Sequence, residues 1–118
     1  MANLTLPVAK GMLDALVLRA LCWAPMHGFE ITAWIEKHSG RTIGLEDAAV
    51  YQSVYRLEAR GMVRAEWGVT SNNRKARYYS ATREGKELLR NEIRSWLRYA
   101  DAVTALLTLT PLAQPKDE

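Results

Sequence analysis

The chain has 118 residues, the length of one ordinary domain, and its composition of 48% hydrophobic and 25% charged residues excludes an intrinsically disordered protein. The formal net charge is only +3, with a pI near 9.2, so affinity for an acidic partner has to come from local clustering of charge. The one cysteine, Cys22, excludes an internal disulfide, and its apolar surroundings indicate a small buried side chain.

The printed sequence shows no targeting signal. Its first residues do not combine a basic segment with a continuous apolar core, so we expect no signal peptide. A membrane span needs roughly 18 consecutive apolar residues, and no such run occurs. We therefore expect a cytoplasmic protein without a membrane partner.

The first predicted element is a helix that follows a short arm, residues 1–7. It is expected to begin near Pro7 or Val8 and to run to about Trp23, because the residue before Pro25 is pushed out of the helical region. Its apolar residues recur at spacings of three and one, as a single buried stripe requires: Leu13, Leu16, Val17, Ala20 and Leu21.

A second helix is predicted over residues 28–38, with His27 as a capping or packing residue at its start. Gly40, after Ser39, suits the left-handed conformation that ends helices. The apolar positions of this helix are Phe29, Ile31, Trp34 and Ile35. Three tryptophans are expected in the core: Trp23, Trp34 and Trp67.

The third helix is predicted to start near Glu46 or Asp47, whose carboxylates suit the positive end of a helix dipole, and to close at Gly61. Its buried stripe is Val50, Val54 and Leu57. Two strands, residues 62–67 and 76–81, follow as a hairpin. This order predicts a helix-turn-helix unit with a two-stranded wing.

The charge of this region is concentrated in the hairpin. Between Gly68 and Arg83 there are four basic residues and no acidic one: Arg74, Lys75, Arg77 and Arg83. A small, polar and cationic hairpin tip after a helix with a polar and aromatic face is typical of nucleic-acid binding. The alternative is a solvated cationic hairpin.

The last helix is predicted from Arg83 to about Leu109, with Thr82 as its N-cap and Pro111 beyond its end. Six apolar residues alternate spacings of four and three along it: Leu89, Ile93, Trp96, Ala100, Val103 and Leu107. This heptad seam predicts a dimerisation helix, the alternative being a helix that only covers its own domain. The predicted division is a winged helix-turn-helix DNA-binding domain over residues 1–82, a dimerisation helix over 83–110 and a tail over 111–118.

The predicted fold class is therefore mainly α with a small β-hairpin, a winged helix-turn-helix plus a long C-terminal helix. The candidate DNA contacts are Tyr51, Gln52, Ser53, Tyr55, Arg56, Asn72, Asn73, Arg74, Lys75 and Arg77. Tyr51 and the wing cations suit phosphates, whereas Gln52 and Tyr55 suit base edges. Arg56 has a structural alternative, an internal charge pair with Glu58, and Tyr55 has one in helix packing.

An ordered set of motifs resembles the PadR-type transcriptional regulators of the short form. It comprises Leu13-Asp14-Ala15-Leu16-Val17-Leu18, Met26-His27-Gly28-Phe29-Glu30-Ile31, Tyr51, Arg56-Leu57-Glu58, Gly61, Glu66-Trp67, Asn73-Arg74-Lys75-Ala76-Arg77-Tyr78-Tyr79, Thr82 and Gly85. The resemblance implies a homodimeric winged-helix repressor of double-stranded DNA. It also implies a small planar aromatic effector, for which Trp96 is the candidate ligand-binding residue, with plain interface core as its alternative.

Three positions depart from the family pattern. Ala49 stands where a hydroxyl residue is usual, Gln52 replaces proline, and Phe29 replaces a common tyrosine. Two hydroxyls are thereby lost, while Gln52 brings a side chain able to pair with adenine. These changes leave a second class of function open, a winged-helix interaction or ligand-binding module that does not bind DNA.

An enzyme, a cofactor and a metal site are not expected. The sequence has no glycine-rich phosphate loop and no nucleophile paired with a base. Its two histidines, His27 and His38, are eleven residues apart, with no cysteine or acidic cluster at ligand spacing.

Overall fold

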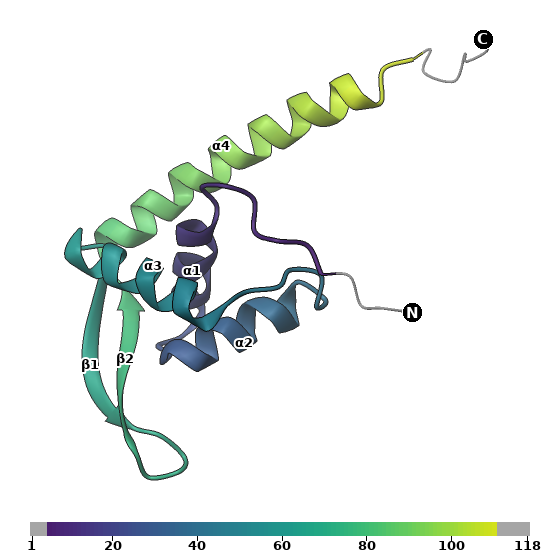
Figure 1. Cartoon of the computed structure of the whole chain (residues 1–118). Coiled ribbons are helices and arrows are strands. Elements are labelled where there is room, and N and C mark those ends of the chain that lie inside the picture. The colour runs from purple at the N-terminus through teal and green to yellow at the C-terminus, as the bar shows by residue number, and fades with distance from the viewer. Residues whose placement is uncertain (1–4, 111–118) are drawn as a thin grey trace.

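The computed structural model describes residues 5–110, and Figure 1 shows the course of the chain. Its four helices and two strands are α1 (Leu13–Trp23), α2 (Gly28–His38), α3 (Asp47–Ala59), β1 (Val63–Val69), β2 (Lys75–Ala81) and α4 (Arg83–Leu107). The predicted fold class is confirmed: a helix-turn-helix, an antiparallel hairpin and a long final helix follow in the expected order. In the described part of the chain, no helix is both long and apolar enough to cross a membrane.

The first helix begins later than the sequence predicted. Gly11 adopts a φ of 83°, a left-handed conformation that cannot continue a right-handed helix, and α1 starts only at Leu13. The described part of the expected arm is bound to the segment between α2 and α3. The Leu6 amide donates to the Thr42 carbonyl at 2.6 Å, and the Leu6 carbonyl accepts from the Gly44 amide at 3.0 Å. Residues 1–4 of the arm, like the expected tail 111–118, lie outside the described residues.

Glycines end α2 and α3 as predicted. Gly40 has a φ of 63° and donates to the Lys37 carbonyl at 3.1 Å, and Gly61 has a φ of 78° and donates to the Glu58 carbonyl at 3.0 Å. The next amide in each case, that of Arg41 or Met62, donates to the carbonyl one residue further back, which completes the left-handed helix terminus. The turn at Gly61 leads the chain from α3 into the wing.

One apolar core joins the three short helices, and it sits between them and the base of the wing. The largest fully buried side chains are Leu18, Ile31, Leu57, Val17, Val50, Val54 and Ser53. The loop between α1 and α2 is tied to the wing, because Met26 and Tyr79 exchange two backbone hydrogen bonds of 3.1 and 2.8 Å. This single-residue bridge fixes the hairpin relative to the helix-turn-helix.

The hairpin is registered from Val63 opposite Ala81 to Val69 opposite Lys75, and it projects away from the helices (Figure 1). Side chains alternate between the faces of a strand, so one face carries Val63, Ala65 and Trp67 with their partners Ala81, Tyr79 and Arg77. At the base this face is buried in the core, and towards the tip it becomes exposed.

Helix α4 starts against the wing and ends in isolation. The Thr82 hydroxyl accepts from the Gly85 amide at 3.1 Å, as expected of an N-cap. A Cβ added to Gly85 would overlap the backbone carbonyl of Met62, so only glycine allows the helix to start this close. Beyond its first turns α4 runs past the other helices and projects from the body of the molecule (Figure 1).

Candidate nucleic-acid interface

The exposed face of α3 is aromatic and polar. Gln52 and Tyr55 are exposed, and Tyr51 is half-buried. The Tyr51 ring lies 6.2 Å from the rings of both Phe29 and Tyr55, so three rings form a row from α2 along α3. Gly28 makes this row possible, because a Cβ at that position would overlap the Tyr51 ring.

Burial raises the pKa of Tyr51 above its ordinary value of 10.0, and the nearby Asp47 carboxylate adds to the rise. Burial also raises the pKa of Tyr79, an effect that the Arg77 guanidinium partly offsets. Both phenols are therefore protonated at neutral pH. The Tyr51 hydroxyl can serve as a hydrogen-bond donor beside the hollow described below.

Ser53, expected at the DNA surface, is a core residue. Its side chain is 0% exposed, and its hydroxyl donates to Oδ1 of Asp14 in α1 at 2.6 Å. The prediction of a DNA contact from Ser53 is wrong because this position faces α1, on the same side of α3 as Val50, Val54 and Leu57.

Arg56 also binds α1. Its Nη2 lies 2.7 Å from Oδ1 of Asp14, so one carboxylate holds both Ser53 and Arg56. The sequence had suggested Glu58 as the partner of Arg56. Glu58 instead pairs with Arg77 of β2 at 2.7 Å, and α3 is thereby linked to α1 on one side and to the wing on the other.

The remaining wing cations are free of such partners. Within residues 5–110, no carboxylate oxygen lies within 4.0 Å of the charged groups of Arg74 or Lys75. The Lys75 ammonium lies over the ring of Trp67, 5.8 Å from its centroid. Asn72 and Asn73 are exposed beside them in the turn, so four of the predicted wing contacts lie at the surface.

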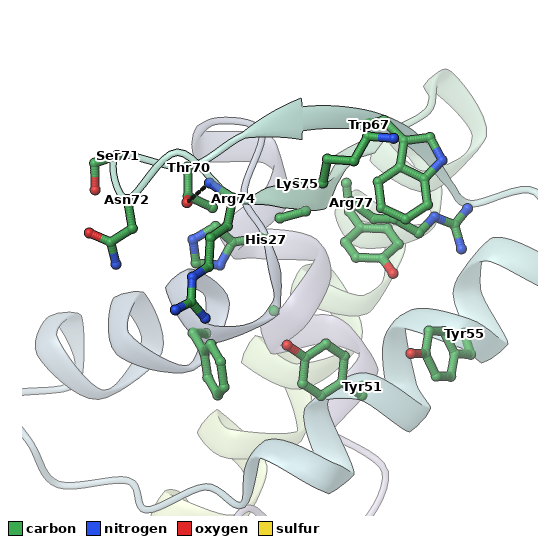
Figure 2. A pocket seen from close by; sticks show the side chains of 14 residues that line it. His27, Tyr51, Tyr55, Trp67, Thr70, Ser71, Asn72, Arg74, Lys75 and Arg77 are labelled. Atoms are coloured by element: carbon green, nitrogen blue, oxygen red, sulfur yellow. Dashed lines mark hydrogen bonds between the residues drawn. The ribbon is translucent and has the colours of Figure 1, made fainter.

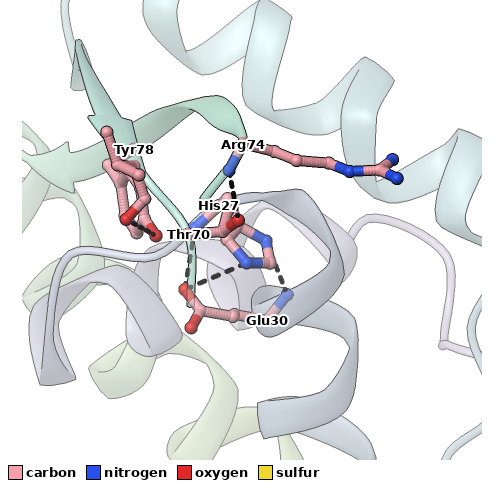
Figure 3. Close-up of polar contacts among 6 residues, drawn as sticks. His27, Glu30, Thr70, Arg74 and Tyr78 are labelled. Atoms are coloured by element: carbon pink, nitrogen blue, oxygen red, sulfur yellow. Dashed lines mark hydrogen bonds and ion pairs between the residues drawn. The ribbon is translucent and has the colours of Figure 1, made fainter. Parts of the chain in front are cut away.

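The turn itself is tightly hydrogen-bonded. Thr70 donates its amide to the Arg74 carbonyl at 2.8 Å, and its hydroxyl accepts from the Arg74 amide at 3.3 Å. Asn73 holds the left-handed φ of 61° that closes the turn. Figure 3 shows the Arg74 side chain extending away from this bonded backbone.

Between α3 and the wing lies a hollow of about 530 Å³. Figure 2 shows Tyr51 and Tyr55 on the helix facing Trp67, Lys75 and Arg77 on the wing, with Arg74 at one end. None of the fourteen lining residues is acidic: His27, Gly28, Phe29, Tyr51, Tyr55, Trp67, Thr70, Ser71, Asn72, Arg74, Lys75, Ala76, Arg77 and Tyr79. The hollow is thus a cationic and aromatic surface.

Two tryptophans expected in the core lie at the surface. Trp67 is 68% exposed, because it shares the face of Val63 but sits beyond the point where the strand leaves the core. Trp23, at the end of α1, is 63% exposed. Trp34 alone packs against the core as expected, and it is half-buried. Neither Trp67 nor Phe29 was predicted from the sequence as a lining residue of the hollow. The strand register, which pairs Trp67 with Arg77, places both on one face of the wing.

His27 caps α2, as the sequence suggested. Its Nδ1 accepts from the Glu30 amide at 3.4 Å, and the Glu30 carboxylate accepts from the His27 amide at 3.1 Å (Figure 3). These reciprocal bonds form a capping box. Across residues 5–110 no group of three His, Cys, Asp or Glu side chains is placed to hold a metal ion.

Residues 17–91 match the transcriptional regulator PadR-like family. The chain belongs to the PadR family. It is similar to a PadR family transcriptional regulator from Eggerthella lenta, with 30% identity, a TM-score of 0.73 and 86% of each chain covered. A PadR-like transcriptional regulator from Bacillus cereus shares the fold at 23% identity and a TM-score of 0.72, over 84% of this chain and 94% of that one. An uncharacterized protein of Lysinibacillus sphaericus is 26% identical over 81% of this chain and 88% of its own length.

The predicted seam of this PadR-family chain divides into two parts. Leu89 is only 6% exposed and belongs to the core of its own winged domain, so at this position the alternative interpretation of the seam holds. Ile93 and Trp96 are 41% exposed, and Leu107 is 70% exposed. Ile93 and Trp96, together with Leu16 of α1, line a groove of about 270 Å³ between α1 and α4.

Proposed function

We propose that this PadR-family chain is a sequence-specific DNA-binding regulator that acts as a homodimer and represses transcription. The observation that carries the proposal is the hollow between α3 and the wing, whose lining includes three cations and no acid. Such a surface attracts a phosphate backbone, and the release of condensed counterions favours binding. Family membership supports the same conclusion.

In this proposal α3 enters the major groove. Gln52 and Tyr55 are its exposed candidates for base edges, and the protonated Tyr51 hydroxyl donates to a phosphate. Arg74 and Lys75, with Asn72 and Asn73, bind the flanking backbone. Arg56 and Arg77 act mainly by holding α3 and the wing in place, because both already bind carboxylates.

The homodimer is proposed to form through the exposed part of α4. A helix with exposed Ile93, Trp96, Leu97 and Leu107 presents an apolar face that a second copy can bury. Ala100 and Val103, less exposed, lie on the same predicted seam. Two-fold symmetry then requires a near-palindromic operator with half-sites about 34 Å apart, or a multiple of it.

A planar aromatic effector is proposed to bind at Trp96. This ring lies at the edge of the groove between α1 and α4, where a dimer partner would face it. Planar compounds are then expected to quench tryptophan fluorescence, and Trp96→Ala is expected to lose that quenching. A full quench in the variant would place the effector elsewhere.

The proposal is tested by fluorescence anisotropy of labelled DNA from upstream of the protein's own gene. We expect tight binding that resists unrelated competitor DNA and weakens steeply with salt. A genome-wide selection of bound fragments covers the case of a distant operator. Binding no tighter than to unrelated DNA in both experiments would support the other candidate, a module that does not bind DNA, which the loss of hydroxyls at Ala49 and Phe29 favours.

A further inference from the structure

The two histidines of the chain lie at opposite ends of α2 and have opposite hydrogen-bonding roles. At the start of the helix, Nδ1 of His27 accepts from the Glu30 amide at 3.4 Å (Figure 3), so in the capping box this nitrogen carries no proton. At the end, Nδ1 of His38 lies 2.9 Å from the Trp34 carbonyl oxygen, which can only accept, so this nitrogen carries a proton. Neutral His27 is therefore protonated on Nε2, and neutral His38 on Nδ1.

Uptake of a second proton affects these two hydrogen bonds differently. An imidazolium has two N–H donors and no acceptor. His38 gains the proton on Nε2 and still donates to the Trp34 carbonyl. His27 can gain it only on Nδ1, which then points one donor at another, the Glu30 amide, so this bond cannot persist. An ordinary imidazole takes up its second proton at about pH 6.5.

The surroundings of His27 offer the imidazolium a new partner. Among residues 5–110, Glu30 supplies the one carboxylate within 4.0 Å of the ring: its Oε1 lies 3.7 Å from Nε2 and accepts from the His27 amide at 3.1 Å. On β2 the Tyr78 ring stands 5.5 Å away, edge to face. The other charged and titratable groups of α3 and the wing share the lining of the hollow with His27: Tyr51, Tyr55, Arg74, Lys75, Arg77 and Tyr79. The Glu30 carboxylate can therefore exchange the backbone amide for the imidazolium.

We infer that the capping box of α2 is a pH-dependent conformational switch. With neutral His27 the box is closed. With protonated His27 the Glu30 amide loses its acceptor, the Glu30 carboxylate pairs with the imidazolium, and the first turn of α2 opens.

This opening reaches α3 through Gly28, the first residue of α2. Gly28 packs so closely on Tyr51 that an added Cβ would overlap the ring, so a movement of this turn changes the seat of Tyr51. A consequence for DNA rests on the proposed function, in which Tyr51 binds a phosphate. The opening of the box does not rest on it, and it is measured without DNA.

Nuclear magnetic resonance of the full chain tests both the tautomers and the switch. At pH 8, long-range proton–nitrogen spectra should show an unprotonated Nδ1 in His27 and an unprotonated Nε2 in His38. Between pH 8 and pH 5 the Glu30 amide proton should shift upfield with the same midpoint as the His27 ring. At pH 5 this amide should exchange with solvent roughly fivefold faster than in His27→Asn, the ratio expected for the loss of a helix N-cap. The Tyr51 ring resonances should follow the same midpoint.

His27→Asn is the matched variant, because an asparagine oxygen caps the same helix position and does not titrate in this range. It should keep the Glu30 and Tyr51 resonances constant from pH 8 to pH 5. His38→Gln removes the other imidazole and should leave the response of Glu30 in place. Circular dichroism and thermal melts establish that each variant folds.

Several results would overturn the inference. A proton on Nδ1 of His27 at pH 8 would show that the capping bond does not form. A Glu30 amide that stays constant while the His27 ring titrates, or that shifts equally in His27→Asn, would show that the cap does not switch. A constant Tyr51 ring would overturn the connection to α3. Failure of DNA binding in the anisotropy experiment would remove the proposed function and leave these spectra unchanged.

Discussion

The arginines and lysines of the candidate interface fall into two groups, those that already bind a carboxylate and those that do not. Arg74 and Lys75 are unpaired with any carboxylate within the described residues, whereas Arg56 binds Asp14 and Arg77 binds Glu58, each at 2.7 Å. An unpaired surface cation can bind a phosphate without losing an internal bond. The two groups of arginines and lysines should therefore differ in what their removal does to DNA binding.

Replacing both unpaired cations, in Arg74→Gln with Lys75→Gln, should weaken binding to all DNA sequences alike. Each phosphate contact contributes about −0.9 to the slope of log affinity against log salt, so the slope should become shallower by about two. Anisotropy titrations over a salt series measure this, with Arg90→Gln as the matched control on α4. A changed operator preference at an unchanged slope would contradict the assignment.

The raised pKa of Tyr79 makes stability sensitive to alkaline pH. A phenol whose pKa is higher in the folded protein than its ordinary 10.0 contributes stability that is complete below pH 10 and is lost as pH rises through the folded pKa. Tyr79→Phe keeps the buried ring and removes the ionising hydroxyl. Urea unfolding from pH 9 to pH 11 should show a smaller loss of stability in this variant, and parallel losses in both proteins would refute the explanation.

At the scale of elements, two carboxylates hold α3 in place. Asp14 of α1 binds it on one side, and its own Glu58 binds the wing on the other. Asp14 of α1 accepts from Ser53 at 2.6 Å and from Arg56, while Glu58 reaches across to Arg77 on the wing. Asp14 is next to Ala15 and Leu16, which line the groove between α1 and α4. Helix α1 therefore contacts α3 on one side and lines the groove to α4 on the other.

Asp14→Asn should weaken the attachment of α3 to α1 without creating a cavity in the core. The buried Ser53 hydroxyl loses a charged acceptor, which should cost about 2 kcal/mol of unfolding free energy, and the half-exposed Arg56 adds little. DNA affinity should fall as well, since α3 loses its fixed orientation. Urea unfolding and anisotropy check the two effects, with Glu36→Gln on α2 as the control. Unaltered DNA affinity would show that α3 needs no such anchor.

At the scale of the whole molecule, the first part of α4 packs against the winged domain and its last part extends beyond that domain. Its first turns pack against the core through Leu89, and its last turns project freely (Figure 1). The molecule extends 64 Å along its longest axis but only 19 Å along its shortest. The projecting part of α4 exposes Ile93, Trp96 and Leu107, the apolar face that we propose a second copy covers.

Two leucines of the same seam should therefore behave differently. Leu89→Ala should lower the unfolding free energy by about 3 kcal/mol, because it leaves a cavity in the core. Leu107→Asp should leave the winged domain folded and raise the dimer dissociation constant about tenfold or more, because it places a charge in the proposed interface. Urea unfolding and sedimentation equilibrium separate the two results, and a dimer unaffected by Leu107→Asp would place the interface elsewhere.

The sequence by itself determined the order of elements, the glycine helix ends at Gly40 and Gly61, and the caps at His27 and Thr82. These depend on local periodicity and backbone preference, which neighbouring residues encode. The resemblance to the PadR family came from the ordered set of motifs along the chain. Only the tertiary structure decided that Ser53 is buried, that Arg56 binds Asp14 rather than Glu58, that Trp67 is exposed and that Leu89 is core. Each of these depends on which distant element packs against the side chain, and a pattern within one helix or strand carries no record of that partner.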